Sequence, residues 1–210
     1  MTTPSAAQAD PARGHTSATL LEASGLPIDL DPDLRPLWPG ARLAGPAFTV
    51  QGTGGDNLAL HRAILLAPAK SVLVVDVGGA RHGHWGEILA VAAQTRGIAG
   101  LLLDGGARDA AEQQRLGFPV FSRNNAIRGT GKDFPGMFGV RVTVGGIAID
   151  SGDLVVGDVD GVVAVPAAHI DRVLAAADAR VAKETEYLAR IRAGETTMAL
   201  YGFRPPGSPA

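Results

Sequence analysis

Cysteine is absent from the 210 residues, which excludes disulfides, thiolate nucleophiles, iron–sulfur clusters and zinc–thiolate sites. No apolar run approaches the roughly 20 residues that a membrane-spanning helix needs, and the first twenty residues lack the apolar core of a signal peptide. The formal net charge is −2 and there is no long basic run, so the charge favours neither nucleic acid nor an anionic membrane as a partner. We therefore expect a cytoplasmic protein with no nucleic-acid or membrane partner.

The residues that are present indicate one folded α/β domain. Hydrophobic residues make up 46% of the chain, charged residues 19%, and there are 28 glycines, which is typical of a globular protein. A chain of this length can bury one good core. We expect a disordered leader at 1–15, a folded domain at 16–195, and a C-terminal tail at 196–210.

The first half of the sequence alternates helical and strand patterns. SVLVVD (71–76) and GLLLD (100–104) are continuous apolar runs of strand length, typical of a sheet covered on both faces. The other elements expected in this half are a helix between Thr16 and Gly25, a strand at 47–53, a helix between Asp56 and Pro68, a loop at 77–85, a helix between Gly86 and Gly97, a turn at 105–109 followed by a short helix ending before Gly117, and a strand at 118–122.

The second half has a different pattern. VRVTVGGIAI, LVVGD and GVVAVP are short β runs separated by glycine and aspartate turns, which predicts hairpins. From Pro166 an apolar residue recurs at helical spacing, predicting a long amphipathic helix over 166–193. This arrangement predicts a layered α/β fold with a mixed sheet.

The stretch from Gly86 to Asp109 carries the residues best suited to chemistry. Two strand–loop–helix units place their loops at the carboxyl ends of neighbouring strands, where ligands gather in open α/β sheets. The first unit supplies the helix start Gly86, Glu87, Ile88 and Leu89, whose backbone N–H groups can bind a carboxylate or an enolate oxygen. The second supplies Arg108 and Asp109 after Gly105-Gly106.

Arg108 and Asp109 together describe a site for a 2-oxo acid. The arginine offers a planar donor fork that matches a carboxylate. The aspartate suits a hard, oxygen-ligated cation such as Mg²⁺ or Mn²⁺. The alternative is purely structural, because such a pair is often a capping aspartate beside a solvated arginine, and Glu87 at a helix start is favoured by the dipole alone.

The segment GEILAVAAQTRGIAGLLLDGGARDAAEQQRLGFPVFSR resembles the signature block of the RraA-like/4-hydroxy-4-methyl-2-oxoglutarate aldolase family. That family carries an acidic residue, twenty intervening positions and then Arg-Asp, and Glu87 and Arg108-Asp109 have this spacing. The similarity extends through GPAFTVQGTGGDNLALHRAI and GGIAIDSGDLVVGDVDGVVAVP, covering roughly residues 16 to 180.

The resemblance implies a swivelling β/β/α-type fold assembled as a homotrimer or homohexamer, with sites near subunit interfaces. It implies pyruvate held by the N–H groups of residues 86–89 and by Arg108, a divalent metal on Asp109, and a metal-associated water contacted by Glu87. The acidic position is aspartate in some of the aldolases, so the water position can differ here. The implied activity is metal-dependent cleavage of a 4-hydroxy-2-oxo acid to pyruvate, with oxaloacetate decarboxylation through the same pyruvate enolate.

Two rival functions remain to be weighed. The RraA branch of the family acts as a protein-binding regulator of RNA degradation, and a shared fold cannot exclude that function; the intact Glu87, Arg108 and Asp109 favour the enzyme. A methyltransferase is rejected because no strand–GxGxG–helix cofactor loop is present.

Other polar residues give weaker signals. His82 and His84 in the expected loop could be metal ligands, substrate contacts or surface residues, and His61 on an apolar helix reads as a core histidine. None of the three lysines, Lys70, Lys132 and Lys183, lies in the motif, which argues against a Schiff-base aldolase. Arg123 and Lys132 border a glycine-rich loop (129–136) that could cover the pocket.

Overall fold

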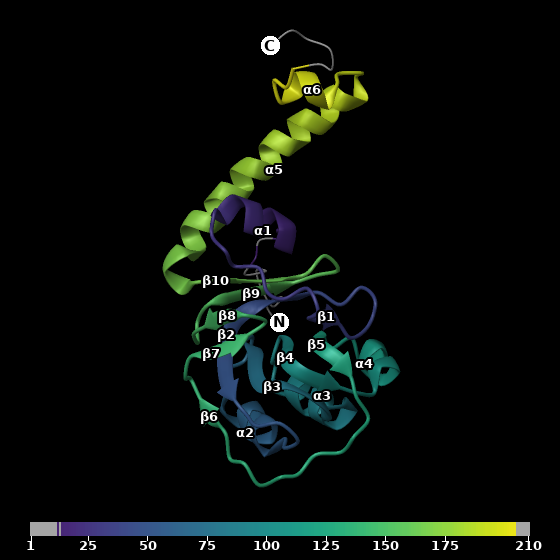
Figure 1. The fold of residues 1–210 in the computed structure, drawn as a ribbon, viewed down its shortest axis with the longest axis vertical. Helices are drawn as coiled ribbons and strands as arrows, with labels where there is room; N and C mark the ends of the chain where they lie inside the picture. Colours follow the sequence, from purple (N-terminus) through teal and green to yellow (C-terminus); the bar gives the residue numbers. More distant parts are fainter. Residues whose placement is uncertain (1–11, 13, 205–210) are drawn as a thin grey trace, which may run out of the picture.

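The computed structural model describes residue 12 and residues 14–204. Within them, a mixed eight-stranded sheet runs in the order β1-β5-β4-β3-β2-β9-β10, and β6 pairs with β2. Helices pack against the sheet, and the longest of them extends away from it over its second half (Figure 1). The strands are β1 (Arg35–Pro36), β2 (Leu43–Gln51), β3 (Val72–Trp85), β4 (Gly100–Ala107), β5 (Val120–Asn125), β6 (Met137–Phe138), β9 (Leu154–Gly157) and β10 (Val162–Val165), with β7 (Val142–Val144) and β8 (Ile147–Ile149) forming a separate hairpin.

The helices follow the strands closely in sequence. They are α1 (Ser17–Ser24), α2 (Leu58–Leu66), α3 (Glu87–Thr95), α4 (Ala110–Leu116), α5 (Ile170–Arg192) and α6 (Thr197–Leu200). The expected start and stop of α1 are confirmed: Thr16 Oγ1 accepts the N–H of Thr19, and Gly25 takes the left-handed conformation at the other end. The layered α/β class with a mixed sheet is likewise confirmed.

The parallel strands β2, β3, β4 and β5 form the centre of the sheet. Successive residues of β3 face opposite ways: Leu73 and Val75 pack with the helices, whereas Val72 and Val74 pack on the other face. Both faces are therefore covered, as the continuous apolar run predicted.

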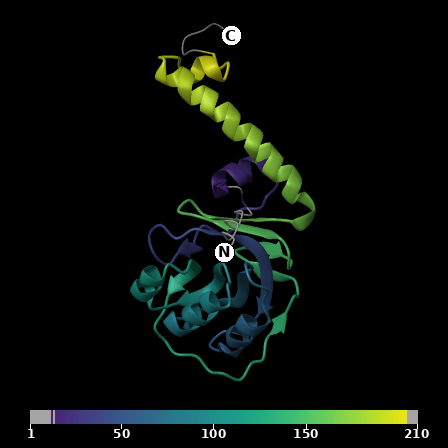
Figure 2. The ribbon, with the colours of Figure 1, turned by 180° about the vertical axis from the view of Figure 1, so that it is seen from behind.

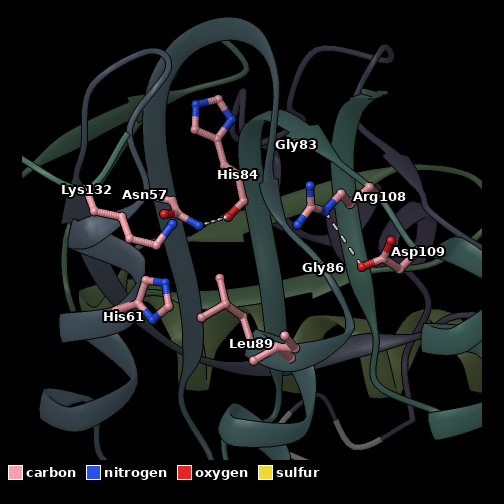
Figure 3. Close-up of a pocket in the computed structure, with 10 residues that line it drawn as sticks. Asn57, His61, Gly83, His84, Gly86, Leu89, Arg108, Asp109 and Lys132 are labelled. Carbon is pink, nitrogen blue, oxygen red and sulfur yellow. Dashed lines mark hydrogen bonds and ion pairs between the residues drawn. The ribbon is translucent and has the colours of Figure 1, made fainter. Parts of the chain in front are cut away.

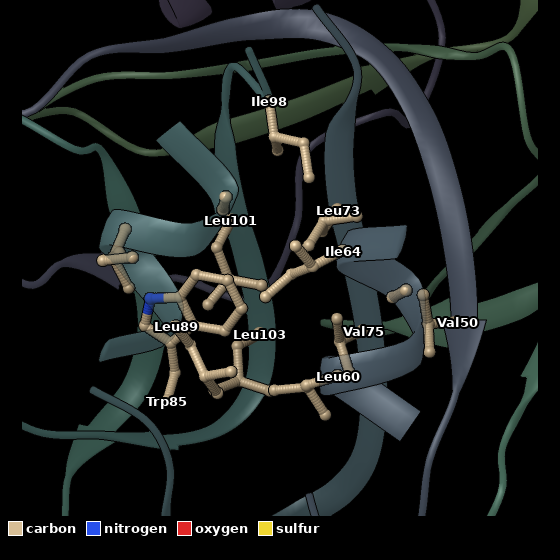
Figure 4. Close-up of a cluster of buried hydrophobic side chains, with 14 of the residues drawn as sticks. Val50, Leu60, Ile64, Leu73, Val75, Trp85, Leu89, Ile98, Leu101 and Leu103 are labelled. Atoms are coloured by element: carbon tan, nitrogen blue, oxygen red, sulfur yellow. The ribbon is translucent and has the colours of Figure 1, made fainter. Parts of the chain in front are cut away.

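The main core lies between the sheet and α2 and α3 (Figure 4). There Leu60 of α2 and Leu89 of α3 meet Val75, Leu101 and Leu103 of the strands. Complete burial of one such side chain contributes about 1.5–3 kcal/mol. This packing fixes the N-terminal ends of both helices against the carboxyl ends of the strands.

Two segments that were predicted as a loop and a turn belong to β-strands. The loop predicted at 77–85 belongs to β3, and the Gly105-Gly106 turn belongs to β4. Irregular pairing beyond Asp76 lets both strands continue, with Ala80 opposite Gly105 and Gly83 opposite Gly106. A Cβ at Gly105 would lie 2.4 Å from a Val77 methyl group, so this glycine permits close strand contact rather than a turn.

β2 begins earlier than predicted, at Leu43 rather than residue 47. Its first residues pair antiparallel with β9, and its last residues pair parallel with β3. The hairpins expected in the second half are present as β7–β8 and β9–β10.

The long C-terminal helix was predicted at 166–193 and occurs as α5 after a short 3-10 turn at Ala167–His169. Its first part is buried through Val173, Leu174 and Ala177, which pack in a cluster with α1, β9 and β10. Its second part leaves the body of the molecule, as both views show (Figures 1 and 2). Val181 and Leu188 are consequently exposed.

The chain ends only partly follow the expected divisions. Residues 1–11 and 13 of the predicted leader lie outside the described residues. Ala12 and His15 are buried, however, and His15 Nε2 lies 2.8 Å from an Asp178 carboxylate oxygen. Packed structure thus begins before residue 16. The predicted tail contains α6, and residues 205–210 lie outside the described part. No helix among the described residues is long and apolar enough to span a membrane.

Candidate active site

A cavity of about 160 Å³ lies at the carboxyl ends of the central strands. Three segments that the sheet brings together line it: the start of α2, the end of β3 together with the first turn of α3, and the residues after β4. The loop after β5 contributes one further residue. The lining residues are Asn57, His61, Gly83, His84, Gly86, Ile88, Leu89, Arg108, Asp109 and Lys132 (Figure 3).

Arg108 follows directly on β4 and presents a donor fork to this cavity. Its backbone N–H donates to the Trp85 carbonyl at 2.9 Å, which ties the residue to the end of β3. A Cβ at Gly83 would lie 3.0 Å from the Arg108 side chain, so the glycine makes room for it. The guanidinium has one ion pair among the described residues, between Nε and Asp109 Oδ2 at 3.8 Å. Most of its donors thus remain available for a carboxylate.

Asp109 has a left-handed backbone, with φ of 59°, a conformation that non-glycine residues rarely adopt. It does not cap α4, which it precedes. Its Oδ2 instead accepts the N–H of Glu87 at 2.9 Å, at the start of α3. A Cβ at Gly86 would lie 2.4 Å from the same oxygen, so the contact requires glycine there. Oδ1 has no partner among the described residues.

The first turn of α3 supplies fewer free donors than the sequence suggested. The N–H of Glu87 donates to the Asp109 carboxylate, and the N–H of Ala90 donates to the Gly86 carbonyl. The N–H groups of Ile88 and Leu89 precede the hydrogen-bond ladder of the helix, and both residues line the cavity. The Glu87 side chain is exposed and is not part of the lining.

The metal position was tested against the donors that the described residues supply. No group of three or more histidine, cysteine or acidic side chains there could hold a metal ion. A closed protein cage is therefore ruled out for this part of the chain. Mg²⁺ usually keeps several waters and binds through one or two carboxylates plus substrate oxygens. The free Oδ1 of Asp109 fits that type of site.

His84 is neither a surface residue nor an exposed loop residue, because its side chain is fully buried in β3. Its Nε2 accepts the N–H of Gly55 at 3.1 Å, and its carbonyl accepts from Asn57 Nδ2 at 3.0 Å. Burial, which outweighs the opposing backbone contacts, lowers the pKa of His84. The neutral ring holds the β2–α2 connection in place.

His61 is not the core histidine that the helical pattern predicted. It is half-buried and lines the cavity. Burial and the nearby charge of Lys132 lower its pKa. The signal that could have identified it is spacing, since His61 follows Asn57 by four residues and thus shares its helix face.

The glycine-rich loop lies at the site, but Arg123 does not. Arg123 donates to Asp104 at 2.5 Å and to Asp31 at 2.7 Å, and these two hydrogen bonds raise its pKa. Its role is structural. Lys132 of the loop lines the cavity as suggested.

Three comparisons place this geometry among known proteins. The family model RraA-like, described as Aldolase/RraA, matches residues 17–164. A protein of Halalkalibacterium halodurans that bears the name "Putative 4-hydroxy-4-methyl-2-oxoglutarate aldolase" is 36% identical over 177 residues, covering 83% of each chain. The structure of an uncharacterized protein from Pseudomonas syringae pv. tomato superposes with a TM-score of 0.81 at 32% identity, covering 92% of each chain.

The RNA-processing inhibitor RraA from Thermus thermophilis has the same fold. Its TM-score is 0.66 at 25% identity, covering 72% of this chain and 93% of that one. The family model spans well over half of the sequence, including Glu87, Arg108 and Asp109. This chain belongs to the RraA-like (Aldolase/RraA) family.

Proposed function

We propose that this protein is a divalent-metal-dependent pyruvate aldolase that cleaves a 4-hydroxy-2-oxo acid, such as 4-hydroxy-4-methyl-2-oxoglutarate, to pyruvate and a second carbonyl product. This proposal rests mainly on one observation: at one small cavity, the open Arg108 guanidinium lies next to Asp109 Oδ1, which has no partner among residues 14–204. The name of the Halalkalibacterium halodurans relative supports the same reaction class. Oxaloacetate decarboxylation is proposed as a second activity.

Arg108 binds the carboxylate of the 2-oxo acid through two charge-assisted hydrogen bonds. Ile88 and Leu89 line the same cavity, and their N–H groups at the start of α3 would stabilise negative charge near the keto group. Asp109 would hold the Mg²⁺ or Mn²⁺ ion, which supplies Lewis-acid stabilisation of charge developing on the keto oxygen.

The bond changes balance without an oxidant or a covalent enzyme adduct. The 4-hydroxyl group loses its proton, its oxygen becomes a carbonyl, and the C3–C4 electrons pass into a pyruvate enolate, which is then protonated at C3. Glu87, exposed beside the Asp109 contact, is the residue proposed to orient the water that carries the hydroxyl proton. Decarboxylation of oxaloacetate yields the same enolate, so one site serves both reactions.

The experiment is a panel of 4-hydroxy-2-oxo acids and oxaloacetate, assayed for pyruvate release with Mg²⁺ or Mn²⁺ and with excess chelator. We expect release that requires the cation. Pyruvate release at full rate in chelator would contradict metal dependence, and no release from any acid would contradict the aldolase. The second candidate is then a non-catalytic regulator of ribonuclease activity, since the Thermus thermophilis relative is described as an RNA-processing inhibitor.

The site is also proposed to work in a homotrimer or homohexamer in the cytoplasm. The exposed second half of α5 supports an assembly, since it carries apolar side chains that the described chain does not cover.

A further inference from the structure

A second cavity, of about 400 Å³, lies apart from the one that Arg108 lines. It is bordered by Asp33 before β1, by Gly79 and Arg81 of β3, and by residues 123–126 at the end of β5. The two cavities share no lining residue. A volume of this size lies within the roughly 300–1,000 Å³ of small-molecule pockets. The reaction proposed above gives this second cavity no role.

An irregularity in β3 forms one wall of the second cavity. Asp76 of β3 pairs with Asp104 of β4, but the next paired residue of β3 is Ala80, opposite Gly105. Residues 77–79 therefore bulge out of the register between the two strands. A Cβ at Gly79 would lie 3.7 Å from the Arg123 side chain and 3.8 Å from an Asp104 carboxylate oxygen. The bulge thus stands over these two side chains, and it leads to Arg81 at the rim.

Arg123 forms the inner wall and has no charge to spare. Its Nε donates to Asp104 Oδ1 at 2.5 Å, and its Nη1 donates to Asp31 Oδ2 at 2.7 Å. One guanidinium is therefore held between two carboxylates, which fixes its position. The three groups together carry no net positive charge. A simple anion such as phosphate gains no net attraction from this wall.

The rim carries two unpaired charges of opposite sign. Arg81 and Asp33 are both exposed and both line the cavity. Among residues 14–204, neither side chain forms an ion pair or a hydrogen bond, and Asp33 is tied to Asp31 only through its backbone N–H. Either charge alone is ordinary on a protein surface. Both charges on one cavity match a ligand that carries both signs.

Asn124 adds a buried acceptor to the same cavity. Its Oδ1 is buried and has no hydrogen-bond partner among the described residues. A Cβ at Gly106 would lie 2.6 Å from this oxygen, so the amide packs directly against β4. A buried acceptor without a donor is unfavourable. A carboxylate has no proton to donate at neutral pH, whereas an ammonium group has three donors. An ammonium group is therefore the better match for this position.

We propose that this second cavity binds a small zwitterion, a free α-amino acid. Its carboxylate pairs with Arg81, and its ammonium group lies between Asp33 and Asn124 Oδ1. The remaining lining is largely polar, so a polar side chain is preferred to an aliphatic one. The proposal is independent of the aldolase function, because none of the residues assigned to that reaction lines this cavity.

The binding test is calorimetric titration of the native chain with L-glutamine and with two compounds that each lack one of its charged groups. The first, 5-amino-5-oxopentanoate, has no ammonium group, and the second, 4-aminobutanamide, has no carboxylate. We expect L-glutamine to bind at least about tenfold more tightly than either, because each loses a charge-assisted hydrogen bond. L-leucine should bind more weakly than L-glutamine. Equal affinity for glutamine and the two compounds, or no binding of L-glutamine, overturns the proposal.

Two substitutions assign the two charges of the ligand. Arg81→Met should abolish the advantage of L-glutamine over 4-aminobutanamide, and Asp33→Asn should abolish its advantage over 5-amino-5-oxopentanoate. Both residues are exposed, and a thermal melt confirms that each variant is folded. Arg192→Met is the control, since Arg192 is an exposed arginine at the end of α5, outside the cavity lining. Native selectivity in both Arg81→Met and Asp33→Asn would overturn the proposal.

A further variant locates the ligand. Arg108 also presents a guanidinium to which an amino acid carboxylate can bind, so binding in the other cavity must be distinguished. Arg108→Lys should leave the affinity for L-glutamine unchanged. A tenfold loss of affinity in Arg108→Lys, with no loss in Arg81→Met, would place the amino acid beside Arg108 and refute the second site.

Discussion

Asp109 Oδ2 accepts the backbone N–H of Glu87 at 2.9 Å, so the carboxylate that follows β4 closes the start of the helix that follows β3. The two acidic positions of the motif are thereby held together although twenty-one residues separate them in the chain. The contact is a helix cap and also the anchor of the proposed metal ligand. The structural and the functional interpretations of Arg108-Asp109 are therefore compatible.

This double role can be separated by two substitutions at Asp109. Asp109→Asn retains an amide oxygen that can accept the Glu87 N–H, and asparagine tolerates the left-handed backbone. We expect it to lose cation-stimulated pyruvate release with little change in the free energy of unfolding. Asp109→Ala loses the cap as well and should be less stable by about 0.5–2 kcal/mol. Urea unfolding and pyruvate assays on both variants check this; an active Asp109→Asn enzyme would refute the ligand role.

The fork of Arg108 gives a second prediction. Lysine keeps the charge but cannot form two parallel hydrogen bonds to a carboxylate, so Arg108→Lys should lower kcat/KM at least about tenfold, equivalent to about 1.4 kcal/mol. Arg115→Lys is the matched control, because Arg115 is an exposed residue of α4 that pairs with Glu112. Steady-state kinetics on both variants give the comparison. Equal kcat/KM in the native chain and Arg108→Lys would exclude the carboxylate-binding role.

The sequence predicted the class of fold because it depends on local patterns, whereas the association of Glu87 with Arg108-Asp109 in one site followed from the family resemblance. Apolar runs mark the covered strands, and the motif lies at their carboxyl ends. It did not predict that Gly105 lies in a strand, because a glycine usually indicates a turn. The reason for this glycine is the close approach of the Val77 side chain from the neighbouring strand, which the sequence does not reveal. For the same reason the position of His61 was predicted wrongly, and Lys132 was predicted only to border a loop that could cover the pocket. They reach the cavity only through the β2–α2 connection and the loop that Asp56 fixes.

Buried His84 predicts a pH dependence of stability. Burial lowers its pKa from the ordinary value of 6.5, while His82 and Asp56 act on it in opposite directions. At a pH between the lowered pKa of the folded chain and the ordinary pKa of the unfolded chain, the unfolded chain binds the proton and the folded chain does not. The free energy of unfolding therefore falls as the pH decreases below about 6.5. The slope from one such proton is at most about 1.4 kcal/mol per pH unit.

His84→Gln is the matching variant. Its amide can accept the Gly55 N–H that His84 Nε2 accepts but does not titrate. Urea unfolding from pH 5 to 7.5 should therefore show a weaker pH dependence for this variant than for the native chain. His61 also has a lowered pKa and remains in both proteins, so the difference between them isolates His84. Identical pH profiles would show that His84 does not contribute.

The second half of α5 carries the last prediction, which concerns assembly. Leu188 and Ile191 are exposed apolar residues near one face of this helix, which extends away from the body in both views (Figures 1 and 2). Covering them with a second copy would remove apolar surface from water at about 25 cal/mol per Å². We expect light scattering at micromolar protein to give three or six times the chain mass of 21.5 kDa.

The substitutions Leu188→Glu and Ile191→Glu together should shift that mass toward the monomer, because they place two charges in the apolar contact. Ala179→Glu is the control: Ala179 is exposed on the same helix, but 3.6 residues per turn place it on the opposite face. It should leave the mass unchanged. Pyruvate release measured on the same samples tests the dependence of the site on assembly. A native chain that is monomeric and still releases pyruvate would refute a site completed by a neighbouring subunit, while the roles of Arg108 and Asp109 within one chain would stand.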